Sequence, residues 1–344
     1  MTAIGSESDV ILAVSGVTKV FARRSLADAI RRRDALRTFA VEDVTLSVRA
    51  GETLGIVGES GSGKTTLARM MVRLLSPDAG AITFRGEDVS QARGEDLRRL
   101  RRRVQLVYQD PYSSLNPALT VGAAIGEPAL VHGLADRGSI DARVGELMEQ
   151  VGLRANLRSR LPRDLSGGQR QRVAIARALA VEPELLVADE AVSALDVSIQ
   201  AQVVGLLAEL QRSLGLTLVF VSHQLATVSH LCERVVIMYR GRIVEAGPTA
   251  EVFARPRHGY TAALMAAHPG RRPQSPIAAA EAAAEVPAND ASSHDDVGCP
   301  FRHKCRYRVE RCAVETPAEV SIGRDHVSRC FVLPGMAELD DMSA

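Results

Sequence analysis

TLGIVGESGSGKTT occupies residues 53–66 of this 344-residue chain. Residues 53–57 predict a strand, and the apolar-rich run LARMMVRLL from residue 67 predicts a helix. The glycines between them let the backbone curl so that several N–H groups face a bound phosphate. Because this strand–loop–helix order is the context that a phosphate-binding loop requires, we expect phosphates to bind at residues 58–65.

Individual residues of this loop predict individual contacts. Lys64 is one of 3 lysines against 39 arginines, so a lysine here is informative. Its ammonium is expected to reach the β- and γ-phosphates, while the Thr65 hydroxyl binds Mg²⁺. A glycine-rich turn that precedes a helix by chance is the alternative. The expected phosphate-binding residues are Gly58, Glu59, Ser60, Gly61, Ser62, Gly63, Lys64, Thr65 and Thr66.

Apolar strands alternate with helical segments over the second half of the chain. LLVAD (185–189) and TLVFVS (217–222) flank a predicted helix over residues 197–214. This alternation indicates an α/β fold with a parallel sheet covered on both faces. Residues 9–21 and 40–57 also predict strands, and residues 90–165 are mostly helical by pattern.

Two adjacent carboxylates follow the apolar strand at 185–189. Neighbouring side chains at a strand end diverge, so the two acids can take different roles. Asp189 suits the Mg²⁺ shell, and Glu190 suits polarisation of an attacking water. A solvated acidic strand end is the alternative, but the phosphate loop favours the catalytic interpretation.

Composition and charge exclude several classes of function. The net charge is +1 and aromatic residues make up 3% with no Trp, which disfavours general nucleic-acid binding and single-strand stacking. No apolar run is long enough to span a bilayer, and the first ten residues do not resemble a signal peptide. We therefore expect a cytoplasmic protein whose 5 cysteines are thiols or metal ligands rather than disulfides.

A third motif, LSGGQRQR (165–172), lies between the phosphate loop and the two strand-end acids. Here the chain resembles the ATP-binding subunits of ABC transporters, over about residues 9–268. The resemblance implies a P-loop ATPase domain in residues 1–268, with a parallel-sheet core, an antiparallel β subdomain and a helical subdomain at about 90–170. It also implies that the signature of one chain faces the phosphate loop of a second chain, and Ser166, Gly167, Gly168 and Gln169 are then expected to contact ATP.

Four further residues match motifs of that family. Phe21 corresponds to the aromatic that stacks on adenine, and Gln109 to the glutamine that contacts Mg²⁺ and the membrane partner. Asp196 lies in the D-loop motif SALD, and His223 matches the switch histidine near the γ-phosphate. The expected catalytic residues are thus Glu190, His223, Lys64 and Gln109. A core phenylalanine, a surface amide and a strand-end imidazole are the plainer alternatives for Phe21, Gln109 and His223.

The chain departs from the family pattern at two places. Ala191-Val192 stands where Pro-Thr is usual, and Gln224 stands where Asp often follows the switch histidine. Neither change removes a group that touches phosphate or water, so we expect a competent site whose turnover rate is open.

Residues 298–344 form a predicted cysteine-rich tail after a flexible linker at 269–297. Cys299, Cys305, Cys312 and Cys330 lack the short Cys-x2–4-Cys spacing of zinc sites, and four thiolates can hold an iron–sulfur cluster. The tail also looks like the C-terminal extension of oligopeptide and dipeptide importer ATPases, which is associated with a 4Fe-4S cluster. A cluster, zinc and unliganded thiols remain open alternatives.

The resemblance implies an ATP-driven motor for peptide import at the cytoplasmic face of the membrane. Its expected partners are a second ATPase subunit (identical or different), two transmembrane permeases and an extracytoplasmic substrate-binding protein, without nucleic acid. The segment at 110–122 resembles the groove that receives a permease helix, and the basic segment at 22–37 is either a membrane contact or a solvated loop. The alternatives are a soluble ABC-type ATPase acting on nucleic acid or ribosomes, and a subunit that binds nucleotide without hydrolysis.

Overall fold

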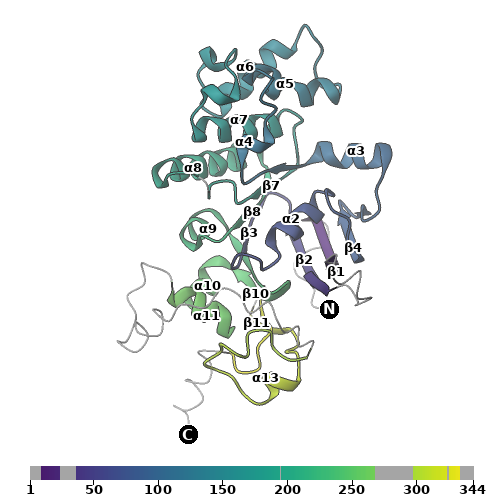
Figure 1. The fold of residues 1–344 in the computed structure, drawn as a ribbon, viewed down its shortest axis with the longest axis vertical. Coiled ribbons are helices and arrows are strands. Elements are labelled where there is room, and N and C mark those ends of the chain that lie inside the picture. The colour runs from purple at the N-terminus through teal and green to yellow at the C-terminus, as the bar shows by residue number, and fades with distance from the viewer. Residues whose placement is uncertain (1–8, 24–35, 194, 268–296, 324, 334–344) are drawn as a thin grey trace, which may run out of the picture.

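The protein, seen in a computed structural model, combines two sheets with a helical lobe (Figure 1). The structure describes residues 9–23, 36–193, 195–267, 297–323 and 325–333. An eight-stranded sheet has the order β11-β12-β10-β9-β3-β8-β7-β6, and a four-stranded sheet has the order β2-β1-β4-β5. The strands are β1 (Val10–Arg23), β2 (Leu36–Arg49), β3 (Thr53–Val57), β4 (Ala79–Phe84), β5 (Glu87–Asp88), β6 (Val104–Val107), β7 (Leu185–Asp189), β8 (Thr217–Ser222), β9 (Arg234–Tyr239), β10 (Arg242–Pro248), β11 (Val320–Gly323) and β12 (His326–Ser328).

The larger sheet contains the predicted parallel core. Strands β6, β7, β8, β3 and β9 are parallel to one another. Every residue of β3, β7 and β8 is buried, as expected for strands with both faces covered. The α/β class and the parallel sheet are therefore confirmed.

Helices cover this sheet and build the helical lobe at the top of Figure 1. They are α2 (Lys64–Met71), α3 (Gly94–Arg103), α4 (Pro111–Ser114), α5 (Val121–Val131), α6 (Ile140–Gln150), α7 (Gly167–Leu179), α8 (Val197–Leu214), α9 (Leu225–Leu231), α10 (Thr249–Ala254), α11 (Gly259–Ala266) and α13 (Arg311–Val314). Two short 3-10 turns, Ala155–Leu157 and Pro162–Asp164, precede α7. Within the predicted helical stretch 90–165, β6 is a strand and pairs with β7.

The antiparallel sheet packs over α2 and the core sheet. Strand β1 pairs with both β2 and β4 in antiparallel register. Val14, Val17 and Val41 of this sheet share one buried cluster with Leu67 and Met70 of α2. This packing holds the start of α2 beside the edge of the antiparallel sheet.

The C-terminal residues 297–333, here called the cysteine segment, dock onto the core. Strand β12 pairs with β10, which places Ser328 opposite Glu245 and extends the main sheet. Cys299, Phe301 and Cys312 join the larger hydrophobic core. The sequence predicted a separate compact tail and did not predict this docking.

Several expectations fall on residues outside the described ranges. These are residues 24–35 of the basic segment, Ala194 of the D-loop, residues 268–296 of the predicted linker and residues 334–344. The division into domains therefore stays a prediction.

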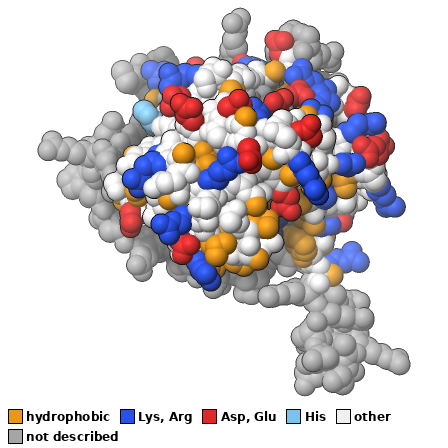
Figure 2. All heavy atoms as spheres, turned by 90° about the horizontal axis from the view of Figure 1, so that it is seen from above, with side chains coloured by type: hydrophobic (Ala, Val, Ile, Leu, Met, Phe, Trp, Pro, Cys, Tyr) orange, Lys and Arg blue, Asp and Glu red, His pale blue; other side chains and the backbone are white. Residues whose placement is uncertain are grey.

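The surface mixes both signs of charge. Figure 2, seen from the helical end of Figure 1, shows Lys and Arg side chains interspersed with Asp and Glu. This pattern agrees with the net charge of +1. Among the described residues, no helix combines the length and the apolar character needed to cross a membrane.

Candidate active site

The phosphate loop connects β3 to α2 through a tightly confined backbone. A Cβ at Gly58 would lie 2.3 Å from the Met238 carbonyl oxygen, and one at Gly63 would lie 2.2 Å from that of Ala40. Gly63 has φ +100° and caps the N-terminus of α2, a conformation that favours glycine. The loop therefore has the glycine-dependent shape that the sequence predicted.

Lys64 lies at the first turn of α2 and is buried. Its Nζ donates hydrogen bonds of 2.8 Å and 2.7 Å to the carbonyl oxygens of Gly58 and Glu59. Burial lowers the pKa of the ammonium, and the carboxylates of Glu190 and Asp189 oppose that shift. The cation is thus held across the loop beside both strand-end acids.

Thr65 and Asp189 meet although they are 124 residues apart. The Thr65 hydroxyl donates a 3.0 Å hydrogen bond to Asp189 Oδ1. Burial raises the pKa of Asp189, while this hydrogen bond opposes the rise. A hydroxyl and a carboxylate are oxygen ligands of the kind that Mg²⁺ prefers, so the predicted metal-binding pair fits the ion.

Glu190 lies between two other predicted residues. Its Oε2 accepts a 2.9 Å hydrogen bond from Gln109 Nε2, and its Oε1 is 3.4 Å from His223 Nδ1. The Glu190 backbone has φ +47°, a left-handed conformation that non-glycine residues rarely adopt. Strain of this kind concentrates at functional sites, and here it occurs at the residue whose carboxylate contacts Gln109 and His223. Gln109 also donates to Ser193 Oγ at 3.3 Å, so the structure places its amide on Glu190 and Ser193.

The signature motif begins α7 in the helical lobe, apart from α2 (Figure 1). Ser166 is the N-cap: its hydroxyl accepts from the Gln169 N–H, and the Gln169 side chain accepts from the Ser166 N–H. A Cβ at Gly168 would lie 2.5 Å from the Ile199 side chain of α8. Asp196, the predicted ATP contact in the D-loop, is the exposed N-cap of α8.

Phe21 lies on β1 with 44% of its surface exposed. It pairs with Thr38, two residues along β2 from Ala40, whose carbonyl oxygen faces Gly63. The Lys19 ammonium is 5.9 Å from the ring centroid. An exposed ring at this edge is available for stacking, and the core alternative for Phe21 is wrong.

One residue at the phosphate loop was missed by the sequence analysis. The Tyr260 hydroxyl, on α11, accepts a 3.0 Å hydrogen bond from the Glu59 backbone N–H. No local pattern marks Tyr260, because it lies 201 residues from the loop.

Comparisons with known proteins agree with this geometry. A family model described as ABC transporter matches residues 41–193, and one described as the C-terminal region of oligopeptide/dipeptide transporters matches residues 244–312. A probable peptide ABC transporter ATP-binding protein of Sinorhizobium fredii is 47% identical, and the match covers 85% of this chain and 82% of the relative. The chain belongs to the ATP-binding proteins of ABC transporters.

Another relative and a solved structure match this chain over nearly all of their own length. A putative peptide import ATP-binding protein of Brucella ovis is 41% identical over 91% of this chain and 98% of its own length. A solved ATP-binding cassette, dimeric with ADP and phosphate after hydrolysis, is 27% identical with a TM-score of 0.62 and covers 70% of this chain and 99% of its own. This ABC protein is therefore an ATPase, and the comparisons do not support the nucleic-acid or ribosome alternative.

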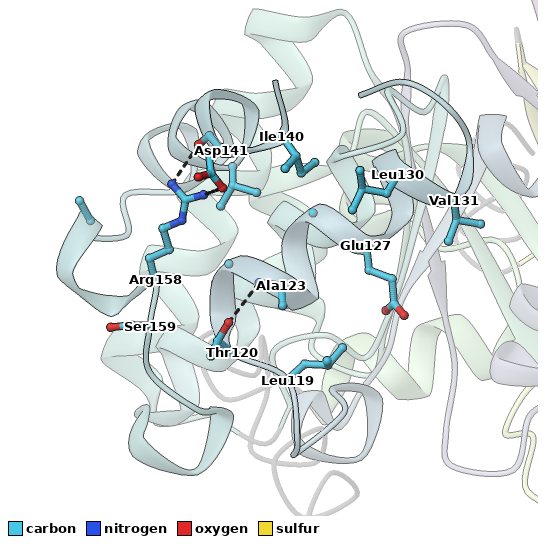
Figure 3. A pocket seen from close by; sticks show the side chains of 14 residues that line it. Leu119, Thr120, Ala123, Glu127, Leu130, Val131, Ile140, Asp141, Arg158 and Ser159 are labelled. Atoms are coloured by element: carbon cyan, nitrogen blue, oxygen red, sulfur yellow. Dashed lines mark hydrogen bonds and ion pairs between the residues drawn. The ribbon is translucent and has the colours of Figure 1, made fainter. Parts of the chain in front are cut away.

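A groove runs along α5 in the helical lobe of this ABC protein (Figure 3). Its volume is about 900 Å³, and Leu119, Thr120 and Gly122 of the segment predicted to form such a groove line it. Figure 3 shows Glu127 and Arg158 at its sides, with Arg158 paired to Asp141.

The cysteine segment brings its thiols together. Cys299, Cys305, Cys312 and Cys330 are all free, and the other three thiols each raise the pKa of Cys299. Burial is the larger cause, and the pKa of Cys299 reaches about 11. Within the described residues, no group of three or more His, Cys, Asp or Glu side chains is arranged to hold a metal ion. The structure thus places the thiols near one another and does not support the bound metal predicted there.

The two departures from the family pattern occupy different settings. Ala191 and Val192 are buried behind Glu190. Gln224 caps α9, where its N–H donates to Ser222 Oγ at 3.0 Å. Cys232, next to that helix, is a buried core thiol, and burial raises its pKa to about 12.

Proposed function

We propose that the protein hydrolyses ATP at a site shared by two ATPase chains and thereby drives peptide import through a membrane permease. The observation that carries the catalytic part is the Glu190 carboxylate, which lies between Gln109 and His223 beside the Thr65–Asp189 pair. In this arrangement Glu190 polarises the attacking water, and His223 and Gln109 orient the carboxylate. Mg²⁺ held by Thr65 and Asp189 would neutralise charge on the β- and γ-phosphates.

The second half of the site comes from another chain. Ser166 and its glycines lie on the helical lobe and offer a hydroxyl and helix N-terminal N–H groups to a γ-phosphate. Val197, beside Asp196, is 82% exposed and is therefore free of contacts within its own chain that would prevent a partner from covering it. ATP binding then closes the two chains, and hydrolysis releases them. The partner is either a second copy or a related ATPase.

The groove along α5 is the proposed seat for a permease helix. Its apolar residues, including Leu130 and Val131 at 42% and 57% exposure, suit the apolar face of a helix. A pair of permeases would hold the protein at the cytoplasmic face of the membrane, and an extracytoplasmic binding protein would deliver the cargo.

Peptides are the proposed cargo because the relatives named above are described as peptide transport proteins. The match to the C-terminal region of oligopeptide/dipeptide transporters supports the same class. Reconstitution into vesicles with the permeases tests the proposal: ATP inside should drive uptake of a labelled dipeptide, and Glu190→Gln should abolish it. Uptake independent of ATP, or ATPase activity unaffected by dipeptide and binding protein, would contradict it.

For the cysteine segment, we propose that the four thiols bind a 4Fe-4S cluster. The other three thiols are near enough to raise the pKa of Cys299, and four thiolates can hold a four-iron cluster. Binding would displace the protons that burial retains on Cys299 and Cys305. Anaerobic purification with iron analysis and visible absorption tests this; colourless, iron-free protein would contradict it.

A further inference from the structure

The residues His258, Gly259 and Tyr260 join the cysteine segment to the phosphate loop. They lie at the start of α11; His258 and Gly259 lie against the cysteine segment, and Tyr260 contacts both regions. His258 Nε2 is 3.9 Å from Cys299 Sγ, and a Cβ at Gly259 would lie 2.5 Å from Cys305 Sγ. The Tyr260 hydroxyl reaches Glu59 of the phosphate loop.

His258 fixes the backbone of this joint. It is buried, its Nδ1 accepts a 3.0 Å hydrogen bond from the Tyr260 N–H, and its own N–H donates to the buried Glu245 carboxylate at 2.9 Å. Because Nδ1 accepts, the neutral imidazole carries its proton on Nε2, which faces the Cys299 sulfur. The position of Tyr260 therefore depends on the same contacts that anchor the cysteine segment.

The Tyr260 ring packs directly against the cysteine segment. Its centroid is 5.4 Å from that of Phe301, which lies between Cys299 and Cys305, and 4.5 Å from that of Tyr239. Tyr260 is 1% exposed and Phe301 is 3% exposed. At packing of this density, a shift of Phe301 has to displace the Tyr260 ring.

The Tyr260 hydroxyl bonds to Glu59, whose backbone N–H and carbonyl oxygen both make hydrogen bonds to side chains. The Glu59 N–H donates to the phenol at 3.0 Å, and the Glu59 carbonyl oxygen accepts from Lys64 Nζ at 2.7 Å. Burial raises the pKa of the phenol, so the hydroxyl stays neutral. Displacement of Tyr260 would free the N–H end of the Gly58–Glu59 peptide unit, whose carbonyl oxygen, on Gly58, accepts from Lys64 Nζ at 2.8 Å.

We propose that Tyr260 is a positioning residue for ATP binding, which makes the shape of the phosphate loop depend on the packing of the cysteine segment. Loss of order around Cys299 and Cys305 then weakens nucleotide binding through Phe301 and Tyr260. The proposal deepens the ATPase assignment and does not depend on peptide cargo or on a bound cluster.

The first test is Tyr260→Phe in the full chain, with the dissociation constant of MgATP measured by calorimetry. One lost hydrogen bond should raise that constant about five-fold to ten-fold. Steady-state KM should rise by a similar factor while kcat stays within about two-fold, because the hydroxyl does not reach Glu190. Tyr239→Phe is the matched control: its ring lies in the same cluster and its hydroxyl bonds to Arg240, so ATP affinity should be unchanged.

The second test links the cysteine segment to the loop. Phe301→Leu should weaken MgATP binding about three-fold in the wild-type background and have no further effect in Tyr260→Phe. Cys305→Ala, which removes the sulfur against Gly259, gives a second variant if Phe301→Leu does not fold. An unchanged MgATP dissociation constant in Tyr260→Phe would overturn the proposal. It would also be overturned if the effects of Phe301→Leu and of Cys305→Ala on that constant each added fully to the effect of Tyr260→Phe. A lower unfolding midpoint with unchanged ATP affinity would show a merely structural role and overturn it equally. A wild-type chain that fails to bind ATP would instead contradict the proposed function.

Discussion

Gln109 Nε2 donates a 2.9 Å hydrogen bond to Glu190 Oε2 and so connects the start of the helical lobe to the end of β7. The same carboxylate is 3.4 Å from His223 Nδ1, at the end of β8. Glu190 therefore links its own segment to two others, and all three meet at the carboxyl edge of the parallel sheet. Any rotation of the helical lobe against the core must act on this hydrogen bond.

Glu190→Gln should retain ATP binding and lose hydrolysis. The amide keeps the shape of the side chain but removes the charge that polarises water, and general-base catalysis contributes about 10²-fold to 10⁴-fold. We expect kcat to fall at least about 100-fold, with a stable dimer in the presence of ATP by size-exclusion chromatography. Glu182→Gln is the matched control, because Glu182 also has a positive φ (53°) but pairs with Arg143 away from the site. Near-normal hydrolysis by Glu190→Gln would remove Glu190 from the catalytic role.

Phe21→Ala should weaken ATP binding only by removing the stacking contact with the adenine base. Stacking of an aromatic on a nucleobase contributes about 1–3 kcal/mol, so the dissociation constant should rise at least about five-fold. Phe21→Tyr should restore most of the affinity. Inorganic tripolyphosphate, which has no base, should bind equally to wild type and Phe21→Ala; an equal loss for both ligands would show that Phe21 supports the loop instead.

Much of the fold follows from local sequence patterns. The predicted segments 185–189, 197–214 and 217–222 coincide with β7, α8 and β8 residue for residue. Fully buried strands require uninterrupted apolar runs, and α8 places its buried residues at helical spacing, at Val203, Leu206, Leu207 and Leu210. One helix ends early: α2 stops at Met71 because Arg73 takes a positive φ of 53°.

Contacts between distant segments were not predictable in this way. The phosphate loop and the acids after β7 were recognised because each has a motif of its own. Tyr260 and the docking of β12 on β10 have none, since a hydrogen bond across 201 residues and a strand pairing after a linker leave no local periodicity. The sequence places the four cysteines in one short segment, but no pattern in it indicates that this segment packs against the core.

Ser166 should act on the ATP of a second chain. Replacing it with Asp keeps a good N-cap for α7 but places a carboxylate where the γ-phosphate of the partner's ATP is expected. We expect Ser166→Asp to unfold at the wild-type temperature. It should lose at least about 90% of ATPase activity, because the repulsion of two like charges in a dry site opposes binding of the γ-phosphate. In a homodimer, mixing Ser166→Asp chains with Lys64→Ala chains should restore part of the activity, because one of the two sites is then intact. If activity is not restored, either by mixing the two variants in a homodimer or by dividing the two substitutions between the subunits of a heterodimer, a shared site is contradicted.

Asp78 should stabilise the strand that carries Phe21 in a pH-dependent way. Its carboxylate accepts from Lys19 Nζ at 2.7 Å and from the Val20 N–H at 2.8 Å, and these hydrogen bonds lower its pKa. A carboxylate with a lowered folded pKa contributes stability above its unfolded pKa of about 3.9, and that contribution is lost as pH falls through the folded value. Because Asp78 is 43% exposed, Asp78→Asn should lower the unfolding midpoint at pH 7 by only about 1–3 °C. The difference from wild type should shrink in unfolding scans below about pH 4; a difference that grows on acidification would contradict this role.

The groove along α5 should be needed for coupling and not for ATP chemistry. Ala123 is exposed and lines the groove, and Figure 3 shows its side chain facing the open space. Ala123→Asp places an unpaired charge where an apolar helix is expected, so assembly with the permeases should weaken by at least about ten-fold. ATP affinity of the chain alone should stay within about two-fold. Gly145→Asp is the matched control: it adds the same charge on α6, where a Cβ meets no atom within 4 Å, and co-purification with the permeases should be unchanged. Equal co-purification of both variants would show that the permease docks elsewhere.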